Sequence, residues 1–205
     1  QKGLHVIDAS CPFVLQTQKI VQQKLQEGFD VLYIGKYRHP EAESIYTLSA
    51  AVHLVQNTKI PNITNPHIFV TNQTTMSIED IDLIFQAIKA KYPQAVFHDE
   101  ICNATRIRQQ AILDLKDQAV DALIVVGDPS SNNTQKLLEI GKSAKIPLRM
   151  KVQTFKDIDL KILHSCSTIA VTSGASTPPY LTNQVIAYLQ GKITKKEKIQ
   201  IGKIL

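Results

Sequence analysis

The chain repeats one pattern of strands and helices, and each copy opens at a cysteine. Cys11 follows the stretch VIDAS, and Cys102 follows VFHDEI 91 residues later. After each cysteine come a polar amphipathic run and an apolar segment that ends in glycine, at Gly35 and Gly127, 24 and 25 residues on. A repeat of this length predicts two similar α/β units, and a cysteine at the same place in each predicts a site built between the copies.

The apolar segments predict which elements form the two units. Short β-branched runs predict strands at 5–8, 31–35, 51–55, 67–72, 122–127 and 168–173. Amphipathic periodicity predicts helices at 12–26, 78–91, 105–117 and 132–143, and a last helix that opens at Pro178 and Pro179. Because strands alternate with helices, we expect an α/β fold of two similar parallel-sheet domains, 1–95 and 96–190, followed by a basic tail at 191–205.

The net charge of +5 comes mainly from that tail. Residues 191–205 hold five lysines and one glutamate, whereas the rest of the chain carries 18 basic and 17 acidic side chains. Nucleic-acid binding needs a basic face on the folded body, so we expect no nucleic-acid partner. No apolar run approaches the ~20 residues of a membrane helix, so we expect no membrane partner either.

The three cysteines are too few and too far apart for a disulfide framework, and no CxxC pair indicates a zinc site. Free thiols favour a reducing, cytoplasmic setting, or a plastid in a plant or alga. The sequence begins with Gln1 directly before an apolar segment, so we expect it to be cut from a longer one.

Polar clusters follow the predicted strands, where ligands bind in open parallel sheets. Residues 131–134 and 174–178 each begin a helix, whose unpaired N–H groups attract anions. Either cluster alone is explained by ordinary helix capping. Two such clusters, beside His-Pro-Glu and TNQTT loops, favour a phosphate or diphosphate site.

Two further features suggest chemistry. His39 and Glu41 flank Pro40, which suits a proton relay or an anion contact. Cys11 and Cys102 each precede a helix, whose N-terminus favours the thiolate form that binds iron. An inert buried cysteine is the alternative for either residue, but their repeated placement argues against it.

Six motifs occur together in one order: DASCP at 8–12, HPE at 39–41, TNQTT at 71–75, DEIC at 99–102, SNN at 131–133 and GASTP at 174–178. Over about residues 4–190 the chain closely resembles the 4-hydroxy-3-methylbut-2-enyl diphosphate reductases of the non-mevalonate isoprenoid pathway. The resemblance implies a pseudo-symmetric trefoil of three α/β domains, of which this chain carries the second and third and lacks the N-terminal one.

The resemblance also implies an activity and its residues. The enzyme is an iron–sulfur oxidoreductase that removes the substrate hydroxyl to give isopentenyl and dimethylallyl diphosphate. Glu41 would donate the proton, and Thr74 would contact the hydroxyl region and hold Glu41. An electron donor such as ferredoxin or flavodoxin would be the protein partner.

The implied ligands fall into two sets. Cys11 and Cys102 would be two of three cysteine ligands of a [4Fe-4S] cluster. The allylic diphosphate would be bound by His39, Ser131, Asn132, Asn133 and Ser176, with Asn132 standing where the family usually has serine.

The family's first domain supplies the third cysteine and two more histidines. We therefore expect this chain alone to be inactive. The main alternative is a non-catalytic diphosphate-binding remnant. The nearly neutral charge of residues 1–190 disfavours a regulatory nucleic-acid-binding protein. The separation of the cysteines in the sequence disfavours a two-cysteine redox protein.

Overall fold

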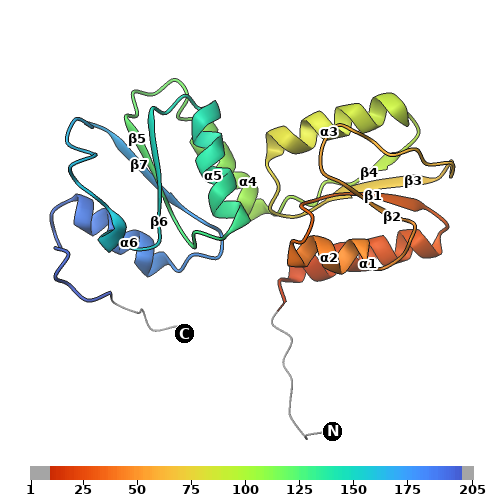
Figure 1. Cartoon of the computed structure of the whole chain (residues 1–205), viewed down its shortest axis with the longest axis horizontal. Coiled ribbons are helices and arrows are strands. Elements are labelled where there is room, and N and C mark those ends of the chain that lie inside the picture. The colour runs from red at the N-terminus through yellow and green to blue at the C-terminus, as the bar shows by residue number, and fades with distance from the viewer. Residues whose placement is uncertain (1–9, 200–205) are drawn as a thin grey trace, which may run out of the picture. The chain divides into compact units, whose positions relative to one another are not determined.

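The computed structural model describes residues 10–199, and the chain divides into two compact units, 1–102 and 103–205 (Figure 1). Each unit is an α/β fold with a parallel sheet, as the sequence predicts. The strand predicted at 5–8 lies outside the described residues.

The first unit runs α1 (Pro12–Gln26), β1 (Asp30–Ile34), α2 (Pro40–Tyr46), β2 (Val52–Val55), β3 (Ile68–Asn72), α3 (Ile78–Lys91) and β4 (Val96–Phe97). Within the described residues its strands form a parallel sheet in the order β2-β1-β3-β4. The central strand β1 is buried along almost its whole length, which explains its continuous apolar sequence.

The second unit runs α4 (Asn103–Leu113), β5 (Ala122–Val126), α5 (Asn132–Ser143), β6 (Leu148–Val152), the 3₁₀ turn η1 (Phe155–Asp157), β7 (Ile169–Ser173) and α6 (Pro179–Leu189). Its described strands form a parallel sheet in the order β6-β5-β7. The order of β2-β1-β3 is repeated, so the duplication seen in the sequence is confirmed.

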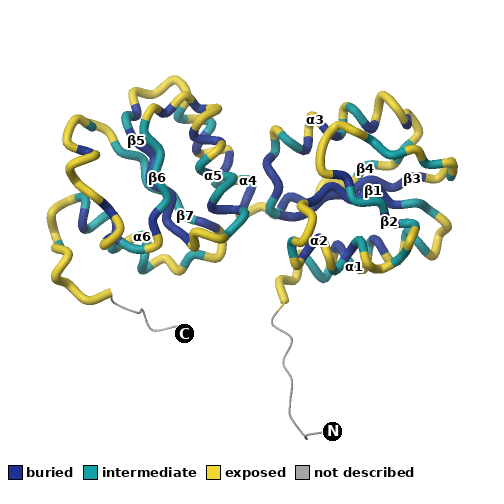
Figure 2. The backbone as a smooth tube through the Cα atoms, viewed as in Figure 1, coloured by how far each residue is buried: buried dark blue, intermediate teal, exposed yellow. Residues whose placement is uncertain are grey.

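Helices cover both faces of each sheet, and the buried residues concentrate between the layers (Figures 1 and 2). In the first unit, Leu32 packs in one apolar cluster with residues of α3, and Val31 packs in another with residues of α1 and α2. In the second unit, Ile124 shares a cluster with α6, and Leu123 shares one with α4 and α5. No helix within residues 10–199 is long and apolar enough to cross a bilayer.

Local sequence explains where several helices begin. Pro12 occupies the first turn of α1, and Pro179 that of α6, because proline lacks the N–H that would be unpaired there. The Ser77 side chain accepts a hydrogen bond from the backbone N–H of Asp80 and caps α3. The predicted bounds of α1, α3 and α5 are confirmed.

Four expectations need correction. The segment after His39 is not a loop but α2, whose seven residues are too few to show a helical period. Helix α4 spans 103–113 rather than 105–117. The strands β4 and β6 were not expected, β4 because it has two residues and β6 because its sequence alternates with Arg149 and Lys151. Because β4 pairs with β3, the first unit extends past residue 95 to Cys102.

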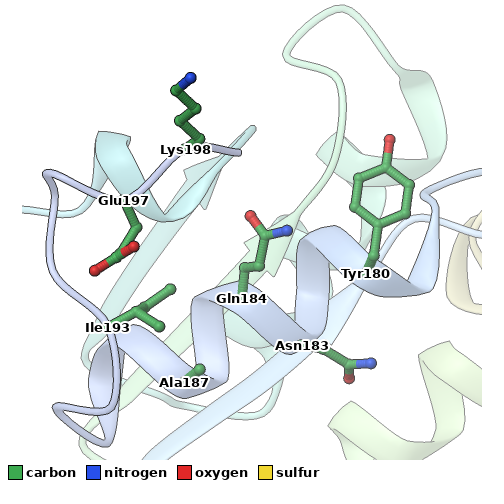
Figure 3. A pocket seen from close by; sticks show the side chains of 7 residues that line it. All are labelled: Tyr180, Asn183, Gln184, Ala187, Ile193, Glu197 and Lys198. Atoms are coloured by element: carbon green, nitrogen blue, oxygen red, sulfur yellow. The ribbon is translucent and has the colours of Figure 1, made fainter. Parts of the chain in front are cut away.

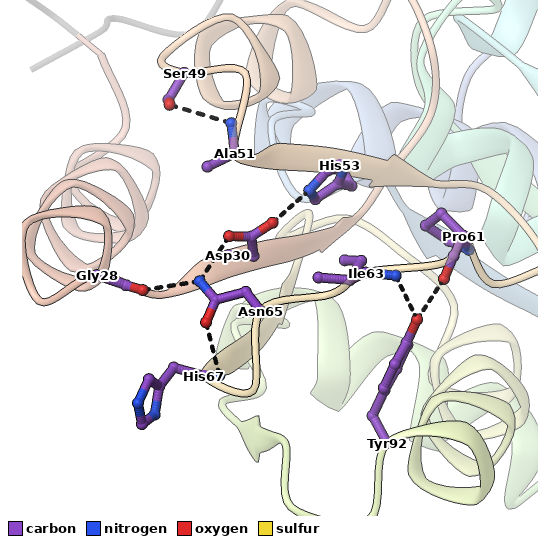
Figure 4. A network of polar contacts seen from close by, with 10 residues as sticks. All are labelled: Gly28, Asp30, Ser49, Ala51, His53, Pro61, Ile63, Asn65, His67 and Tyr92. Atoms are coloured by element: carbon purple, nitrogen blue, oxygen red, sulfur yellow. Dashed lines mark hydrogen bonds and ion pairs between the residues drawn. The ribbon is translucent and has the colours of Figure 1, made fainter.

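A polar network fastens the start of β1 (Figure 4). The Asp30 carboxylate lies 2.9 Å from His53 Nε2 and accepts a 2.8 Å hydrogen bond from Asn65 Nδ2. Burial raises the pKa of Asp30, but the hydrogen bonds from Asn65 and His53 outweigh it and leave the pKa lowered. Nearby, the Tyr92 hydroxyl donates to the Pro61 carbonyl and accepts from Ile63 N–H, both at 2.7 Å. These contacts hold the loop before β3.

We predict that Gly141→Ala destabilises the second unit. The added methyl would lie 2.5 Å from Leu123 Cδ2 and 3.1 Å from Arg149 Cδ. Leu123 is fully buried, so overpacking should cost about 1–3 kcal/mol and offset the ~1 kcal/mol that alanine gains over glycine in a helix. Urea denaturation should show a lower free energy of unfolding. The exposed Lys142→Ala on the same helix is the control, and a Gly141→Ala protein as stable as this control would contradict the prediction.

Candidate active site

The predicted site residues other than Cys11 follow strands of the two parallel sheets, and all of them are divided between the two units. The first unit holds Cys11, His39, Glu41, Thr74 and Cys102. The second holds Ser131, Asn132, Asn133 and Ser176. Each group has its own local geometry and is described by itself.

A tight turn leads from β1 into α2. The N–H of His39 donates to the carbonyl of Lys36 at 3.1 Å, and Arg38 between them has φ of 61°. Such a backbone angle costs energy in a residue with a side chain and is often found at functional sites. The turn places His39 as the N-cap of α2, where its Nδ1 accepts a 3.3 Å hydrogen bond from Glu41 N–H. The neutral ring therefore carries its proton on Nε2.

Glu41 is buried, with 8% of its surface exposed, and both of its oxygens contact Thr74. Oε1 accepts from the backbone N–H of Thr74 at 2.7 Å, and Oε2 lies 3.0 Å from Thr74 Oγ1. The N–H can only donate, so Oε1 stays an acceptor and a proton on the carboxyl group belongs on Oε2. The Thr74 hydroxyl can accept from that proton and donate once it has left.

Burial shifts the titration of both residues toward their neutral forms. Burial raises the pKa of Glu41, with a further rise from the charge of Glu100, and this outweighs the hydrogen bonds from Thr74. Burial also lowers the pKa of His39, and the charge of Lys36 lowers it further. The start of α2 therefore favours an uncharged acid at Glu41 and an uncharged imidazole at His39.

Residues 72–75, at the end of β3 and in the loop after it, connect the other segments around Glu41. Gln73 is fully buried; its Oε1 accepts from Lys36 N–H at 3.0 Å, and its Nε2 donates to Thr75 Oγ1 at 2.9 Å. Asn72 Oδ1 accepts from Glu100 N–H at 3.2 Å. The sequence alone does not reveal the role of Gln73, because its contact with Lys36 spans 37 residues and leaves no local pattern.

Both cysteines stand directly before helices. Cys11 is exposed at the N-cap of α1, and its carbonyl accepts from Leu15 N–H at 3.2 Å. Cys102 is half-buried before α4, and its N–H donates to the Thr74 carbonyl at 3.2 Å. Thr74 thus joins Glu41 to Cys102 through its main chain. Cys166 packs beside the apolar cluster under α6, as expected of a structural cysteine.

The predicted site residues of the second unit lie mainly at the start of α5. Ser131 caps this helix by accepting from Thr134 N–H at 3.3 Å, and its hydroxyl still has a proton to donate. Asn133 is 6% exposed, and within residues 10–199 neither its amide nitrogen nor its oxygen has a hydrogen-bond partner. The buried Nδ2 of Asn132 likewise has no hydrogen-bond partner within these residues. Unpaired buried donors are costly, and here they accompany a helix N-terminus, so the arrangement suits an anion.

Two glycines allow the side chains at the start of α5 to pack closely against the strand ends. A Cβ on Gly127, just after β5, would lie 2.5 Å from Thr134 Oγ1. A Cβ on Gly174, just after β7, would lie 2.9 Å from the same atom and 3.8 Å from Asn133 Nδ2. The N–H of Gly174 donates to the Val126 carbonyl at 2.9 Å and closes the 174–177 turn over β5. Ser176 is exposed on that turn.

A cavity of about 360 Å³ lies elsewhere in the second unit, between α6 and the segment after it (Figure 3). Tyr180, Gln184 and Ile193 are among the residues that line it. None of the predicted site residues borders this cavity. It is therefore separate from the anion-binding arrangement at α5.

Among residues 10–199, no group of three His, Cys, Asp or Glu side chains is arranged to hold a metal ion. Cysteine is the usual ligand of iron–sulfur clusters, and this part of the chain has two cysteines that directly precede helices, Cys11 and Cys102. These two cysteines are the right kind of ligand for such a cluster, but they are too few to hold it.

Known proteins resemble the chain along nearly its whole length. A family model described as LytB protein matches residues 1–190. The 4-hydroxy-3-methylbut-2-enyl diphosphate reductase of Exiguobacterium sp. is 44% identical over 197 residues, covering 92% of this chain and 61% of that protein. The enzyme of the same name from Geobacillus kaustophilus is 41% identical over 194 residues, covering 93% and 61%. The chain thus spans about 61% of the length of these relatives.

Two solved structures of reductases are also similar to the chain. The reductase from Plasmodium falciparum has a TM-score of 0.84 and 34% identity, covering 90% of this chain and 59% of that one. A second structure, titled (E)-4-hydroxy-3-methyl-but-2-enyl diphosphate reductase, the terminal enzyme of the non-mevalonate pathway, has a TM-score of 0.56 and 28% identity over 93% of this chain and 69% of its own.

We predict that Asn133→Asp abolishes anion binding at α5. The new carboxylate would repel an anion where the amide donates to it. In an NMR titration with inorganic pyrophosphate, the backbone amides of 131–134 and 174–177 should shift in the native chain and stay fixed in the variant. Asn57→Asp, in an exposed loop of the first unit, makes the same charge change and should leave the titration unaltered. Equal shifts in native and Asn133→Asp protein would rule out this role.

Proposed function

The chain belongs to the LytB protein family, and from this premise we propose that it takes part in the reductive dehydroxylation of 4-hydroxy-3-methylbut-2-enyl diphosphate. The products would be isopentenyl and dimethylallyl diphosphate. The observation that carries the proposal is the buried Glu41 carboxyl group, held by Thr74 and biased toward its protonated form.

The reaction consumes two electrons and two protons. The bond between the substrate carbon and its hydroxyl oxygen breaks, and one proton leaves with that oxygen as water. The two electrons reduce the remaining allyl group to the level of an allyl anion, which takes the second proton on a carbon atom. A one-electron carrier such as ferredoxin or flavodoxin would supply the electrons.

Glu41 is suited to protonate the leaving hydroxyl. A proton donor is most effective when its pKa lies near the working pH, and burial moves Glu41 in that direction. Thr74 N–H keeps Oε1 occupied, so the proton on Oε2 is the one that can be transferred. As it leaves, the Thr74 hydroxyl turns to donate to Oε2 and stabilises the carboxylate.

The diphosphate would be bound mainly by neutral donors. His39 offers Nε2–H, because its Nδ1 is taken by Glu41 N–H. Ser131, Asn132, Asn133 and Ser176 offer hydroxyl and amide groups. The unpaired amide of Asn133 supports this role, since a buried amide without a partner needs an acceptor from outside the protein.

Cys11 and Cys102 would bind an iron–sulfur cluster, with further ligands from outside residues 10–199. When bound, the cluster would supply electron transfer between the one-electron carrier and the substrate. The protein's part here is to hold both thiolates at helix starts and to fix Cys102 to Thr74, the residue that also holds the acid.

We predict that Glu41→Gln lowers kcat by about 10²–10⁴-fold in the full-length gene product, because the transferable proton is lost. Substrate binding should be retained, since glutamine can still accept from Thr74 N–H and contact its hydroxyl. Single-turnover kinetics and equilibrium binding measure the two effects. In the native enzyme, turnover should fall as the pH rises through the raised pKa of Glu41, because the carboxyl group is then ionised.

Glu43→Gln is the matched control, because Glu43 lies on the same helix with its side chain exposed. It should leave kcat unchanged. Lost binding with full turnover per bound substrate in Glu41→Gln would contradict the proton-donor role.

We also predict that a purified polypeptide of residues 1–205 has no reductase activity and retains little cluster. Two thiolates are a poor set of ligands for four iron atoms. After reconstitution with iron and sulfide, the iron kept through gel filtration should depend on added small thiols. It should fall further in Cys11→Ser or Cys102→Ser, whereas Cys166→Ser should match the native chain. Normal turnover with dithionite would refute this expectation.

A further inference from the structure

A tyrosine hydroxyl is buried behind Glu41. Tyr33 is fully buried in β1, and within residues 10–199 its hydroxyl has no hydrogen-bond partner. A buried hydroxyl without a partner is rare and usually marks a function or an ordered water. The activity proposed above does not use this residue.

The ring faces the helix that carries Glu41. Tyr33 shares its apolar cluster with Ala42, the next residue after Glu41. A Cβ on Gly35 would lie 2.8 Å from Tyr33 Cε1 and 3.2 Å from Ala42 Cβ, so the ring edge beside the hydroxyl lies against the first turn of α2. In β3 the register partner of Tyr33 is Thr71, whose buried Oγ1 is also unpaired within the described residues. Residues paired in register point to the same face of a sheet.

Two buried carboxyl groups lie on this side of the sheet. Glu41 and Glu100 are each 8% exposed. Burial raises the pKa of Tyr33, and the charges of Glu41 and Glu100 raise it further, so both act on the phenol. The hydroxyl therefore keeps its proton and meets these groups as a hydrogen-bond donor.

We propose that Tyr33 is a positioning residue that donates a hydrogen bond, directly or across one buried water shared with Thr71, to the Glu41 carboxylate left after proton transfer. Thr74 then holds the carboxylate from one side and Tyr33 from the other. Because a hydrogen bond to a carboxylate is stronger than one to a neutral carboxyl group, the contact lowers the free energy of the state that follows protonation of the leaving hydroxyl. The catalytic part of this proposal rests on the proposed acid role of Glu41.

Other charged groups lie near α2. The elements in contact with it carry Asp30 on β1, His53 on β2, and Lys19 and Lys24 on α1, and Lys36 and His39 lie on the preceding turn. After β4 come His98, Asp99 and Glu100. Asp30 pairs with His53, Lys24 pairs with Glu27, and His98 lies 3.2 Å from Glu100. Among these groups, Glu100 is the one whose charge acts on Glu41, where it raises the pKa of the carboxyl group.

Tyr33→Phe tests the proposal in the chain itself. Glutamate labelled with ¹³C at Cδ reports each carboxyl group, and the Glu41 resonance is the one missing from Glu41→Gln. Removing a donor that bonds the charged form more strongly than the neutral one should move the Glu41 titration midpoint upward by about one pH unit. A midpoint that is unchanged or lower overturns the proposal.

Tyr92→Phe is the matched control. It removes the same atom, but the Tyr92 hydroxyl is bonded to Pro61 and Ile63 in the loop before β3 (Figure 4). It should leave the Glu41 midpoint in place. Site-specific 3-fluorotyrosine at position 33 gives a second test without deleting the hydroxyl. The more acidic phenol is a stronger donor, so the midpoint should move downward, which a purely structural role of Tyr33 would not produce.

Kinetics separate this inference from the proposed function. In the full-length gene product, the decline of kcat at high pH should move upward in Tyr33→Phe together with the NMR midpoint. If Glu41→Gln keeps full turnover, the acid role of Glu41 fails even when the NMR shift is present. If the NMR midpoint does not move, the Tyr33 contact fails whatever the kinetics show.

Discussion

The first unit depends on the main chain of Thr74. Its N–H donates to Glu41, and its carbonyl accepts from Cys102 N–H. One residue after β3 thereby fixes the acid at the start of α2 and the cysteine at the start of α4. Gln73 and Asn72 extend the same loop to Lys36 and Glu100. The segments that carry the site are thus fastened to a strand end, where the sheet gives the loop a rigid base.

The two groups of predicted site residues use different physical means. In the first unit, burial favours the uncharged forms of Glu41 and His39, so that the carboxyl group has a proton to give up. In the second unit, uncharged amides and hydroxyls lie at a helix N-terminus, and two glycines allow the Thr134 and Thr177 side chains to pack closely there. Neither group contains a lysine or an arginine, which agrees with the nearly neutral charge of residues 1–190.

The sequence predicts much of this architecture because its signals are local. Pro12, Ser77 and Ser131 mark helix starts, and β-branched runs mark the central strands. Helix α2 was missed although Pro40 followed by Glu41 and Glu43 is a typical helix start, because seven residues show no period. The site motifs identify which residues matter but not how they are held. The contacts of Gln73 and Tyr33 join segments far apart in the chain, and in the sequence Tyr33 reads as one more apolar strand residue.

The fastening through Thr74 also limits what side-chain mutagenesis can reveal. Thr74→Ala removes the hydroxyl but leaves both main-chain hydrogen bonds, to Glu41 and from Cys102. An alanine scan would therefore understate this position, and sequence drift could alter its side chain while the backbone geometry persisted. An amide-to-ester replacement of the Thr74 N–H would expose the hidden contribution, because it deletes the donor and leaves every side chain as it was.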